Sequence, residues 1–442
     1  MEDKSPSALP PACRPHFHHA ATAGWMNDPV GMRWHRGEWH LFFQASPAID
    51  GSAMGWGHAV SEDRLRWTAR PPILAADASG LAWSGSVCPD PDGALIAFHT
   101  RHDPATGQEQ QAAARETAEG LWEPVPLSIG EARPGWRDPF VFAHGSGWRM
   151  LLAEPIGWQP APGARSKLAL YRSADLRQWA RVGVLPVGAI EGELLEMPAL
   201  CCLAPDCWLL LAGVVDRSGA GAPCHSRAWL GLFDGDAFAP RLGPIRLDHG
   251  PDFYAAGPWG SLPPFACELT AWLNSWDTAR SVPGKSWSGG VHSLPRRLSL
   301  VGDRLLQHPA ADPAEGWAER EAELSAGASL APGDAARLRL GLAPGTGFML
   351  GCGAVELAVT AATDELRVAR TAQADVPGFA GEWRLPWSGA ALTLFLDRAS
   401  VEIFLADGTA TASFLLPFSQ APLLHVVSGS VRAHVATIGE AA

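Results

Sequence analysis

The sequence predicts an all-β fold, a five-bladed β-propeller followed by a C-terminal β-sandwich. Short apolar runs alternate with turns along the chain, which holds 47 glycines and 38 prolines in 442 residues. Such runs, bounded by Gly and Pro, are typical of β-strands. No segment before residue 300 carries a long apolar pattern with the period of a helix. A repeat of polar motifs over the same region favours propeller blades.

The expected strands are short and bounded by turn residues on both sides. Clear examples are 39–44, 94–99, 148–153 and 208–213. Each is the length of a strand and too short for a typical helix. We therefore expect sheets of several short strands rather than a helical domain.

Five polar residues follow each other at nearly constant spacing. Asp28, Ser84, Asp138, Glu196 and Asp252 lie 56, 54, 58 and 56 residues apart. The first strand of each propeller blade lines the central axis, so equivalent positions on successive blades converge there. The repeat predicts five blades and one axial site that these residues share.

The chain is predicted to divide into a propeller over residues 1–303, a linker over 304–316 and a sandwich over 317–442. Beyond the linker, segments such as 336–342 and 392–396 alternate apolar and polar residues. This alternation is typical of antiparallel sheets with one face in water. The C-terminal region carries no dense carboxylate motif, so we expect it to serve packing.

Charge and composition exclude several classes of protein. Lysine and arginine total 34 against 46 aspartates and glutamates, a net charge of −12, which argues against a nucleic-acid partner. The chain contains no run of about 18 apolar residues, so no membrane span is expected. The start of the chain lacks the pattern of a secretory signal, and the 8 cysteines show no regular framework, so we expect a cytoplasmic protein.

Three carboxylates on one axis indicate catalysis. Asp28, Asp138 and Glu196 would raise each other's pKa values, which a fold seldom tolerates without a use. A pair of carboxylates with different roles is typical of glycoside hydrolysis, and the 20 tryptophans suit stacking on sugar rings. The structural alternative is that Asp28 and Asp138, each followed by proline, are turn residues and that most tryptophans pack the blades.

The motifs that contain these residues resemble glycoside hydrolase family 32, which includes invertases, inulinases and levanases. The resemblance covers nearly the whole chain and keeps the order of the family's motifs. The matching segments are 25–31, 41–47, 56–59, 83–86, 136–139, 196–198, 252–255, 287–290, 294–298 and 397–404.

The resemblance implies a role for each matched residue. Asp28 would be the nucleophile, Glu196 the acid/base, and Asp138 the stabiliser of the transition state together with Arg137. The substrate-binding set would comprise Asn27, Gln44, Trp56, Trp83, Ser84, Arg137 and Asp252. Such an enzyme retains configuration, with the two working carboxyls about 5–5.5 Å apart. No metal or organic cofactor is expected, and His18 and His19 are interpreted as surface or blade-closure residues.

The expected activity is release of fructose from sucrose or short fructans. Three alternatives stay open, namely a fructosyltransferase, a furanosidase for another sugar and a carbohydrate-binding protein without catalysis. With only three lysines, a phosphorylated substrate is disfavoured. Three departures from the family pattern affect the expected site: Val30 replaces an asparagine, Met197 replaces a cysteine, and the segment 50–55 is short.

Overall fold

The computed structural model confirms the all-β prediction. It describes residues 14–154, 165–188, 193–216, 223–279, 289–371, 376, 378–416 and 419–438. Within these ranges the chain forms strands and no helix, so the described part contains no helix that is long and apolar enough to cross a bilayer. The strands make seven sheets, five in the N-terminal part and two in the C-terminal part.

The five N-terminal sheets are antiparallel and are built in chain order. The first contains β1 (Trp25–His35), β2 (Glu38–Ser46), β3 (Gly55–Ser61) and β4 (Thr68–Leu74), and the second β5 (Leu81–Pro89), β6 (Leu95–Asp103), β7 (Gln108–Glu116) and β8 (Trp122–Val125). The third contains β9 (Arg137–His144), β10 (Gly147–Glu154), β11 (Lys167–Ser173) and β12 (Ala180–Val184). The fourth contains β13 (Glu193–Ala204), β14 (Cys207–Asp216), β15 (Cys224–Phe233) and β16 (Phe238–Arg246). The fifth contains β17 (Tyr254–Pro258), β18 (Cys267–Leu273), β19 (Val291–His292), β20 (Arg296–Val301) and β21 (Arg304–Pro309).

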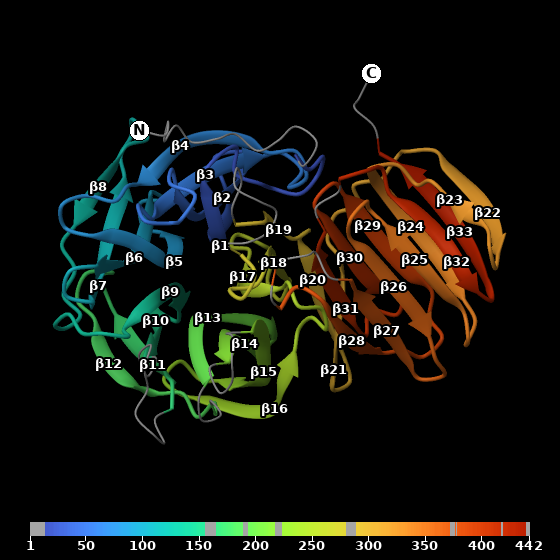
Figure 1. Cartoon of the computed structure of the whole chain (residues 1–442). Helices are drawn as coiled ribbons and strands as arrows, with labels where there is room; N and C mark the ends of the chain where they lie inside the picture. The colour runs from blue at the N-terminus through green and yellow to red at the C-terminus, as the bar shows by residue number, and fades with distance from the viewer. Residues whose placement is uncertain are drawn as a thin grey trace, which may run out of the picture.

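These sheets stand around a common axis (Figure 1). The first strand of each sheet faces the axis, and each of these inner strands contacts the next, from β1 to β5, β9, β13 and β17. Strand β17 also contacts β1, which closes the ring. The arrangement fits a propeller, and it explains why motifs far apart in the sequence meet at the centre.

The fifth sheet extends into the range that the sequence analysis interprets as a linker. Strand β21 pairs with β20 along its whole length, from Arg296 opposite Pro309 to Val301 opposite Arg304. The predicted linker 304–316 is therefore wrong over its first six residues. Strand β21 is an outer strand with only one buried residue, so its sequence lacks the apolar run that marks the inner strands.

The C-terminal part contains two six-stranded antiparallel sheets that fit a sandwich (Figure 1). One contains β22 (Glu319–Ser325), β33 (Ser430–Thr437), β24 (Ala335–Leu342), β29 (Leu392–Asp397), β30 (Ser400–Leu405) and β31 (Thr411–Leu415). The other contains β23 (Ser329–Leu330), β32 (Leu423–Ser428), β25 (Gly347–Gly351), β26 (Glu356–Ala361), β27 (Glu365–Arg370) and β28 (Gly381–Pro386). Side chains such as Leu394 and Val426 fill the space between apolar faces, as the alternation in the sequence predicts.

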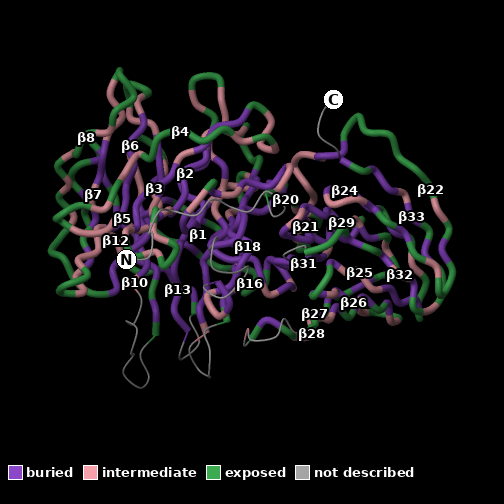
Figure 2. The backbone as a smooth tube through the Cα atoms, turned by 45° about the horizontal axis from the view of Figure 1, so that its top comes forward, coloured by how far each residue is buried: buried purple, intermediate pink, exposed green. Residues whose placement is uncertain are grey.

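The inner strands run through the most buried parts of the molecule, and the connecting loops are exposed (Figure 2). The largest hydrophobic cluster crosses from the sandwich sheets into the fourth and fifth sheets, with Leu394 and Ile403 on one side and Leu211 and Leu269 on the other. The two parts of the chain therefore share a core.

A buried charge network crosses the same boundary. Arg296 of β20 is fully buried, and its guanidinium binds Asp248 Oδ2 at 2.9 Å and Glu402 Oε2 of β30 at 2.6 Å. His18 bridges Asp397 Oδ2 and Glu402 Oε1, each at 2.9 Å. Burial opposes charging of this imidazole, but the two carboxylates outweigh it and raise the pKa of His18 to about 9. His18 and His19 are thus buried residues, which corrects the interpretation of them as surface residues.

Arg296→Met is expected to destabilise the protein by about 3–5 kcal/mol, because it leaves Asp248 and Glu402 buried without the guanidinium between them. The neighbouring Arg297 is exposed and pairs with Glu268, which also binds Arg64. Arg297→Met is therefore the matched control, with an expected cost of about 1 kcal/mol or less. Chemical denaturation of the two variants measures the difference, and equal losses would contradict the role given to Arg296.

Candidate active site

Every inner strand breaks its pairing register within or beside the motif that the sequence places at the axis. The breaks lie between Met26 and Pro29, Trp83 and Gly85, Arg137 and Phe140, Glu196 and Ala199, and Tyr254 and Gly257. A β-bulge of this kind turns side chains away from the alternation of the strand. Asp138, Met197 and Ala255 adopt positive φ angles at these breaks, a conformation uncommon for residues with a side chain. The breaks on the first four inner strands lie at residues that line one cavity on the axis.

This cavity on the axis has a volume of about 450 Å³. Eight of the ten predicted site residues line it, namely Asn27, Asp28, Gln44, Trp83, Ser84, Arg137, Asp138 and Glu196. They come from the first four sheets, and Trp25, Asp50, Gly51, Met54, Leu81 and Trp276 complete the lining. Of the five residues of the repeat, Asp28, Ser84, Asp138 and Glu196 therefore converge as predicted, and Asp252 does not.

Asp28 is buried in the wall of the cavity and held by the neighbouring sheet. Its Oδ2 accepts a hydrogen bond from Ser84 Oγ at 2.7 Å. Burial raises the pKa of Asp28 to about 6, against the opposing effect of hydrogen bonds from Ser84 and Asn27. The Asn27 Oδ1 atom in turn accepts from Trp25 Nε1 at 2.7 Å. Asp28 is thus a fixed carboxylate that ionises close to neutral pH.

Glu196 sits between a cation and a phenol. Arg137 Nη1 donates to Glu196 Oε1 at 2.9 Å, and the Tyr254 hydroxyl donates to Oε2 at 2.5 Å. The other end of the guanidinium contacts Glu109 Oε1 at 3.1 Å. Glu109 also accepts from the backbone N–H of Trp136 at 2.7 Å, which fixes it in turn. Both oxygens of Glu196 are therefore oriented by buried donors from the third and fifth sheets.

Asp138 lines the same cavity as the other two carboxylates. The backbone N–H of Met197 donates to Asp138 Oδ2 at 2.9 Å, and Thr100 accepts from the Asp138 N–H. Burial and the charge of Glu196 raise the pKa of Asp138 well above its usual range, and Arg137 offsets only part of this. Asp28 and Asp138 thus both have raised pKa values in the same cavity.

An aromatic wall borders the carboxylates. Trp83 stacks on His102 with ring centroids 3.8 Å apart and planes 8° from parallel, and the Arg137 guanidinium lies 5.2 Å from the Trp83 ring. Trp25 and Trp276 form a second stacked pair at 6.0 Å. Flat apolar faces beside hydrogen-bonding groups suit a sugar ring.

Two predicted site residues do not line the cavity. Trp56 is almost fully buried and donates its Nε1 hydrogen to the Trp83 carbonyl at 3.0 Å, so it supports Trp83 from behind. Asp252 accepts from the Leu415 N–H at 2.7 Å and forms an ion pair with Arg370, both in the sandwich. In this structure Asp252 ties the fifth sheet to the C-terminal part. On that sheet Tyr254, two residues later, contacts the site instead, through its hydrogen bond to Glu196.

Tyr254 and Glu109 are not among the predicted site residues, and only Tyr254 has a signal in the sequence. Tyr254 is one of only two tyrosines in the chain and lies within a matched motif. Glu109 carries no motif, and only the three-dimensional position of β7 brings it to Arg137. The tryptophan of the motif at 287–290 lies outside the described residues.

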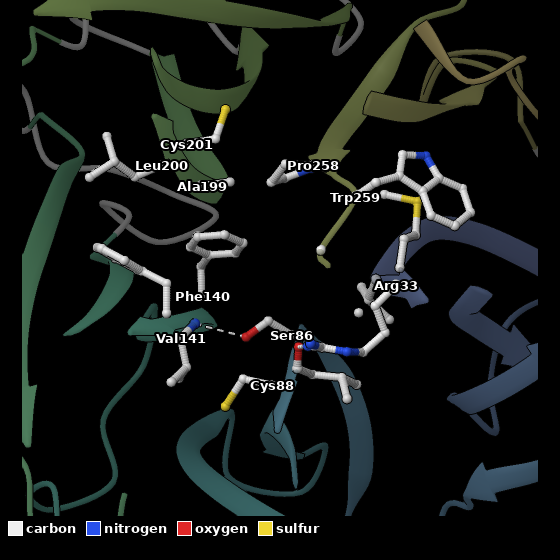
Figure 3. Close-up of a pocket in the computed structure, with 18 of the residues that line it drawn as sticks. Arg33, Ser86, Cys88, Phe140, Val141, Ala199, Leu200, Cys201, Pro258 and Trp259 are labelled. Atoms are coloured by element: carbon white, nitrogen blue, oxygen red, sulfur yellow. Dashed lines mark hydrogen bonds between the residues drawn. The ribbon is translucent and has the colours of Figure 1, made fainter. Parts of the chain in front are cut away.

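The three departures from the family pattern affect different surfaces. Val30 and Met197 line a second cavity of about 360 Å³ further along the axis, called the axial cavity below (Figure 3). The cavity of about 450 Å³ that holds the three carboxylates is called the catalytic cavity below. Met197 is connected to it by its backbone N–H, which donates to Asp138 Oδ2. Asp50, Gly51 and Met54 of the short segment do line the catalytic cavity, so this segment shapes the binding site. Among the described residues, no cluster of three or more His, Cys, Asp or Glu is placed to hold a metal.

Comparison with known proteins agrees with this geometry. The family model for the glycosyl hydrolases family 32 N-terminal domain matches residues 18–309. The chain belongs to this family. Its members are glycoside hydrolases, and this chain is therefore an enzyme of that class.

Relatives of this family 32 chain include enzymes of fungi and bacteria. The raffinose invertase of Escherichia coli is 30% identical, over 90% of this chain and 88% of its own length. The extracellular exo-inulinase of Aspergillus awamori is 29% identical, over 67% of this chain and 64% of its own length. The crystal structure of exo-inulinase from Aspergillus awamori matches with a TM-score of 0.81 and 25% identity, covering 96% of this chain and 98% of that one.

Tyr254→Phe is expected to lower kcat/KM for glycoside hydrolysis about tenfold or more, because a hydrogen bond to a charged group contributes roughly 1.5–3 kcal/mol. Tyr171→Phe is the matched control, since Tyr171 is the other tyrosine of the chain and touches only Arg133 at 3.4 Å among hydrogen-bond partners. Steady-state kinetics with circular dichroism separates loss of activity from loss of fold. Equal kinetics for the two variants would remove Tyr254 from the site.

Proposed function

We propose that this enzyme is a β-fructofuranosidase that releases fructose from sucrose or short fructans with retention of configuration. The observation that carries the proposal is the cavity that Asp28 and Glu196 line together from different sheets, each oriented by buried donors. The relatives named raffinose invertase and exo-inulinase support the same substrate class.

In the proposed reaction Asp28 is the nucleophile. Its carboxylate attacks the anomeric carbon of the fructosyl unit while Glu196 gives a proton to the glycosidic oxygen, and the bond to the leaving sugar breaks. Water then attacks the same carbon, Glu196 takes the water's proton, and Asp28 is released. Asp138 and Arg137 hold ring hydroxyls and stabilise the positive charge of the transition state. Asn27, Gln44, Trp83 and Ser84 complete the fructose subsite.

The proposed site sits in a propeller. We infer that the five N-terminal sheets are its five blades, that they extend to about residue 309, and that the two six-stranded sheets from about residue 317 form a sandwich. Asp252, which the family pattern assigns to the substrate, is given a structural role here because its Oδ2 atom is bound by Arg370 and by the Leu415 N–H.

The charges around the cavity favour a neutral sugar. Arg137 is the only cationic side chain among the described residues that line it, and Glu196 and Glu109 occupy that guanidinium. Asp50 adds a fourth carboxylate at the wall. A phosphorylated sucrose would bring its negatively charged phosphate into this acidic cavity, where the described lining residues offer no free cationic side chain to bind it.

Product analysis on sucrose, sucrose 6-phosphate, inulin and levan tests the proposal. We expect free fructose from sucrose, and a kcat/KM for sucrose 6-phosphate at least about tenfold lower, a difference of roughly 1.4 kcal/mol. Asp28→Ala and Glu196→Ala should each lower kcat by roughly 10³-fold or more while the fold stays intact.

Asp50→Asn is the matched control, because it removes a carboxylate from the same cavity without touching the reacting groups. Near-wild-type activity of the Asp28 or Glu196 variant would contradict the catalytic role proposed for that residue. Elongated fructans at high sucrose would instead identify a fructosyltransferase, and no turnover of any furanoside would identify a binding protein.

The fall of kcat/KM on the acid side of its pH profile, the acid limb, should reflect protonation of Asp28. Because only the ionised carboxylate attacks, kcat/KM is expected to fall about tenfold per pH unit below the pKa of about 6. The Ser84 hydroxyl stabilises the ionised form, so Ser84→Ala should move this limb to higher pH. Ser86→Ala is the control, since Ser86 binds Pro139 and Val141 beside the axial cavity. Rates measured from pH 4 to 8 decide, and an unmoved limb in Ser84→Ala would exclude Asp28 as its source.

A further inference from the structure

Two cysteines from different sheets lie with their sulfur atoms almost in bonding contact. The Sγ atoms of Cys201, on β13, and Cys267, on β18, are 2.6 Å apart, although 66 residues separate them in the chain. Non-bonded sulfur atoms do not pack this closely, whereas a disulfide holds its sulfurs about 2.05 Å apart. A small rotation of either side chain would bring the pair to bonding distance.

The surroundings give the two thiols different access to solvent. Cys267 is buried, but Cys201 is only partly buried and lines the axial cavity of about 360 Å³ (Figure 3). The nearest other thiol with partial exposure, Cys202, donates to the carbonyl of Ala204 at 3.1 Å. Cys88, Cys224 and Cys352 are buried elsewhere. Cys201 is therefore placed to meet a small reagent first, with Cys267 directly behind it.

The two cysteines lie on either side of the boundary between the fourth and fifth sheets, called the joint below, where no described strands pair through backbone hydrogen bonds. In the part of the chain that the structure describes, no strand of the fourth sheet pairs with a strand of the fifth. The two sheets instead meet where β13, β14 and β15 approach β17 and where β13 approaches β18. Glu196 belongs to β13 and its partner Tyr254 to β17, so this joint also carries a contact of the active site.

We propose that Cys201 and Cys267 form a disulfide that fastens the fourth sheet to the fifth when the protein meets a low-molecular-weight disulfide. The Cys201 thiolate attacks one sulfur of the reagent, which forms a mixed disulfide and releases one thiol. The Cys267 thiolate then attacks the Cys201 sulfur, which forms the intramolecular bond and releases the second thiol. Two protein thiols are oxidised and one reagent disulfide is reduced to two thiols. In a reducing compartment the pair stays open.

The bond would act on stability rather than on chemistry. It closes a loop of 66 residues, and cross-links over long loops remove more entropy from the unfolded chain than short ones. It also adds a covalent bond across the joint. We expect a higher Tm for the oxidised protein and unchanged kcat, since neither cysteine lies in the catalytic cavity.

Oxidation of the full-length protein with glutathione disulfide tests the proposal. The expected result is two fewer free thiols after denaturation, an intact mass lower by two hydrogens, and a Cys201–Cys267 link in peptide mapping. The Tm should rise by several degrees and return to its starting value with dithiothreitol.

Cys267→Ser should abolish the rise in Tm and leave glutathione attached to Cys201, whereas the matched control Cys202→Ser should keep the full response. A link from Cys201 to Cys202 or Cys207, or a full set of free thiols after oxidation, would overturn the proposal. These readouts do not depend on the substrate of the enzyme, so they stand or fall separately from the proposed activity.

Discussion

The active site depends on the two buried ion pairs that the guanidinium of Arg137 forms with Glu196 and Glu109. Asp28, Asp138 and Glu196 come within one cavity, and their mutual repulsion and loss of hydration would otherwise disperse them. Arg137 binds Glu196 on one side and Glu109 on the other, so its own position is fixed. The guanidinium lies beside the Trp83 ring, and His102 stacks on the same indole. Removing one member of this layer would therefore disturb groups from three sheets.

The repeated bulge of the inner strands supplies the geometry. Regular pleating would send alternate side chains into the sheet-to-sheet packing, and few could gather at the axis. At each break the pairing skips, and polar side chains turn to the centre instead. The strain of positive φ at Asp138 and Met197 is balanced by the hydrogen bond between them. Local backbone irregularity and long-range charge balance are thus parts of the same construction.

Much of this could be predicted from the sequence, and the gaps have physical causes. Strand patterning and the spacing of the motifs give the fold class and four residues of the cavity, Asp28, Ser84, Asp138 and Glu196, because both are set by local sequence and by the repeat. The other four predicted residues of the cavity come from the family resemblance. Spacing locates a motif only to within a residue or two, however, and a bulge shifts which side chain faces inward. That is why Tyr254 and not Asp252 borders Glu196. The partner of Asp252, Arg370, lies 118 residues away, and no local pattern reports such a pairing.

The network at the boundary between the two parts of the chain limits how the enzyme can change. Asp248, Asp252, Arg296 and Arg370 are all buried, and each finds its counter-charge or hydrogen-bond partners across that boundary. Neither part can be exchanged for a foreign one without matching these charges, so the two are inherited as a unit. Substitutions in the segment 50–55, a loop that lines the catalytic cavity, should cost less stability than changes at this boundary. New substrate preferences should therefore arise by remodelling of such loops rather than by recombination of domains.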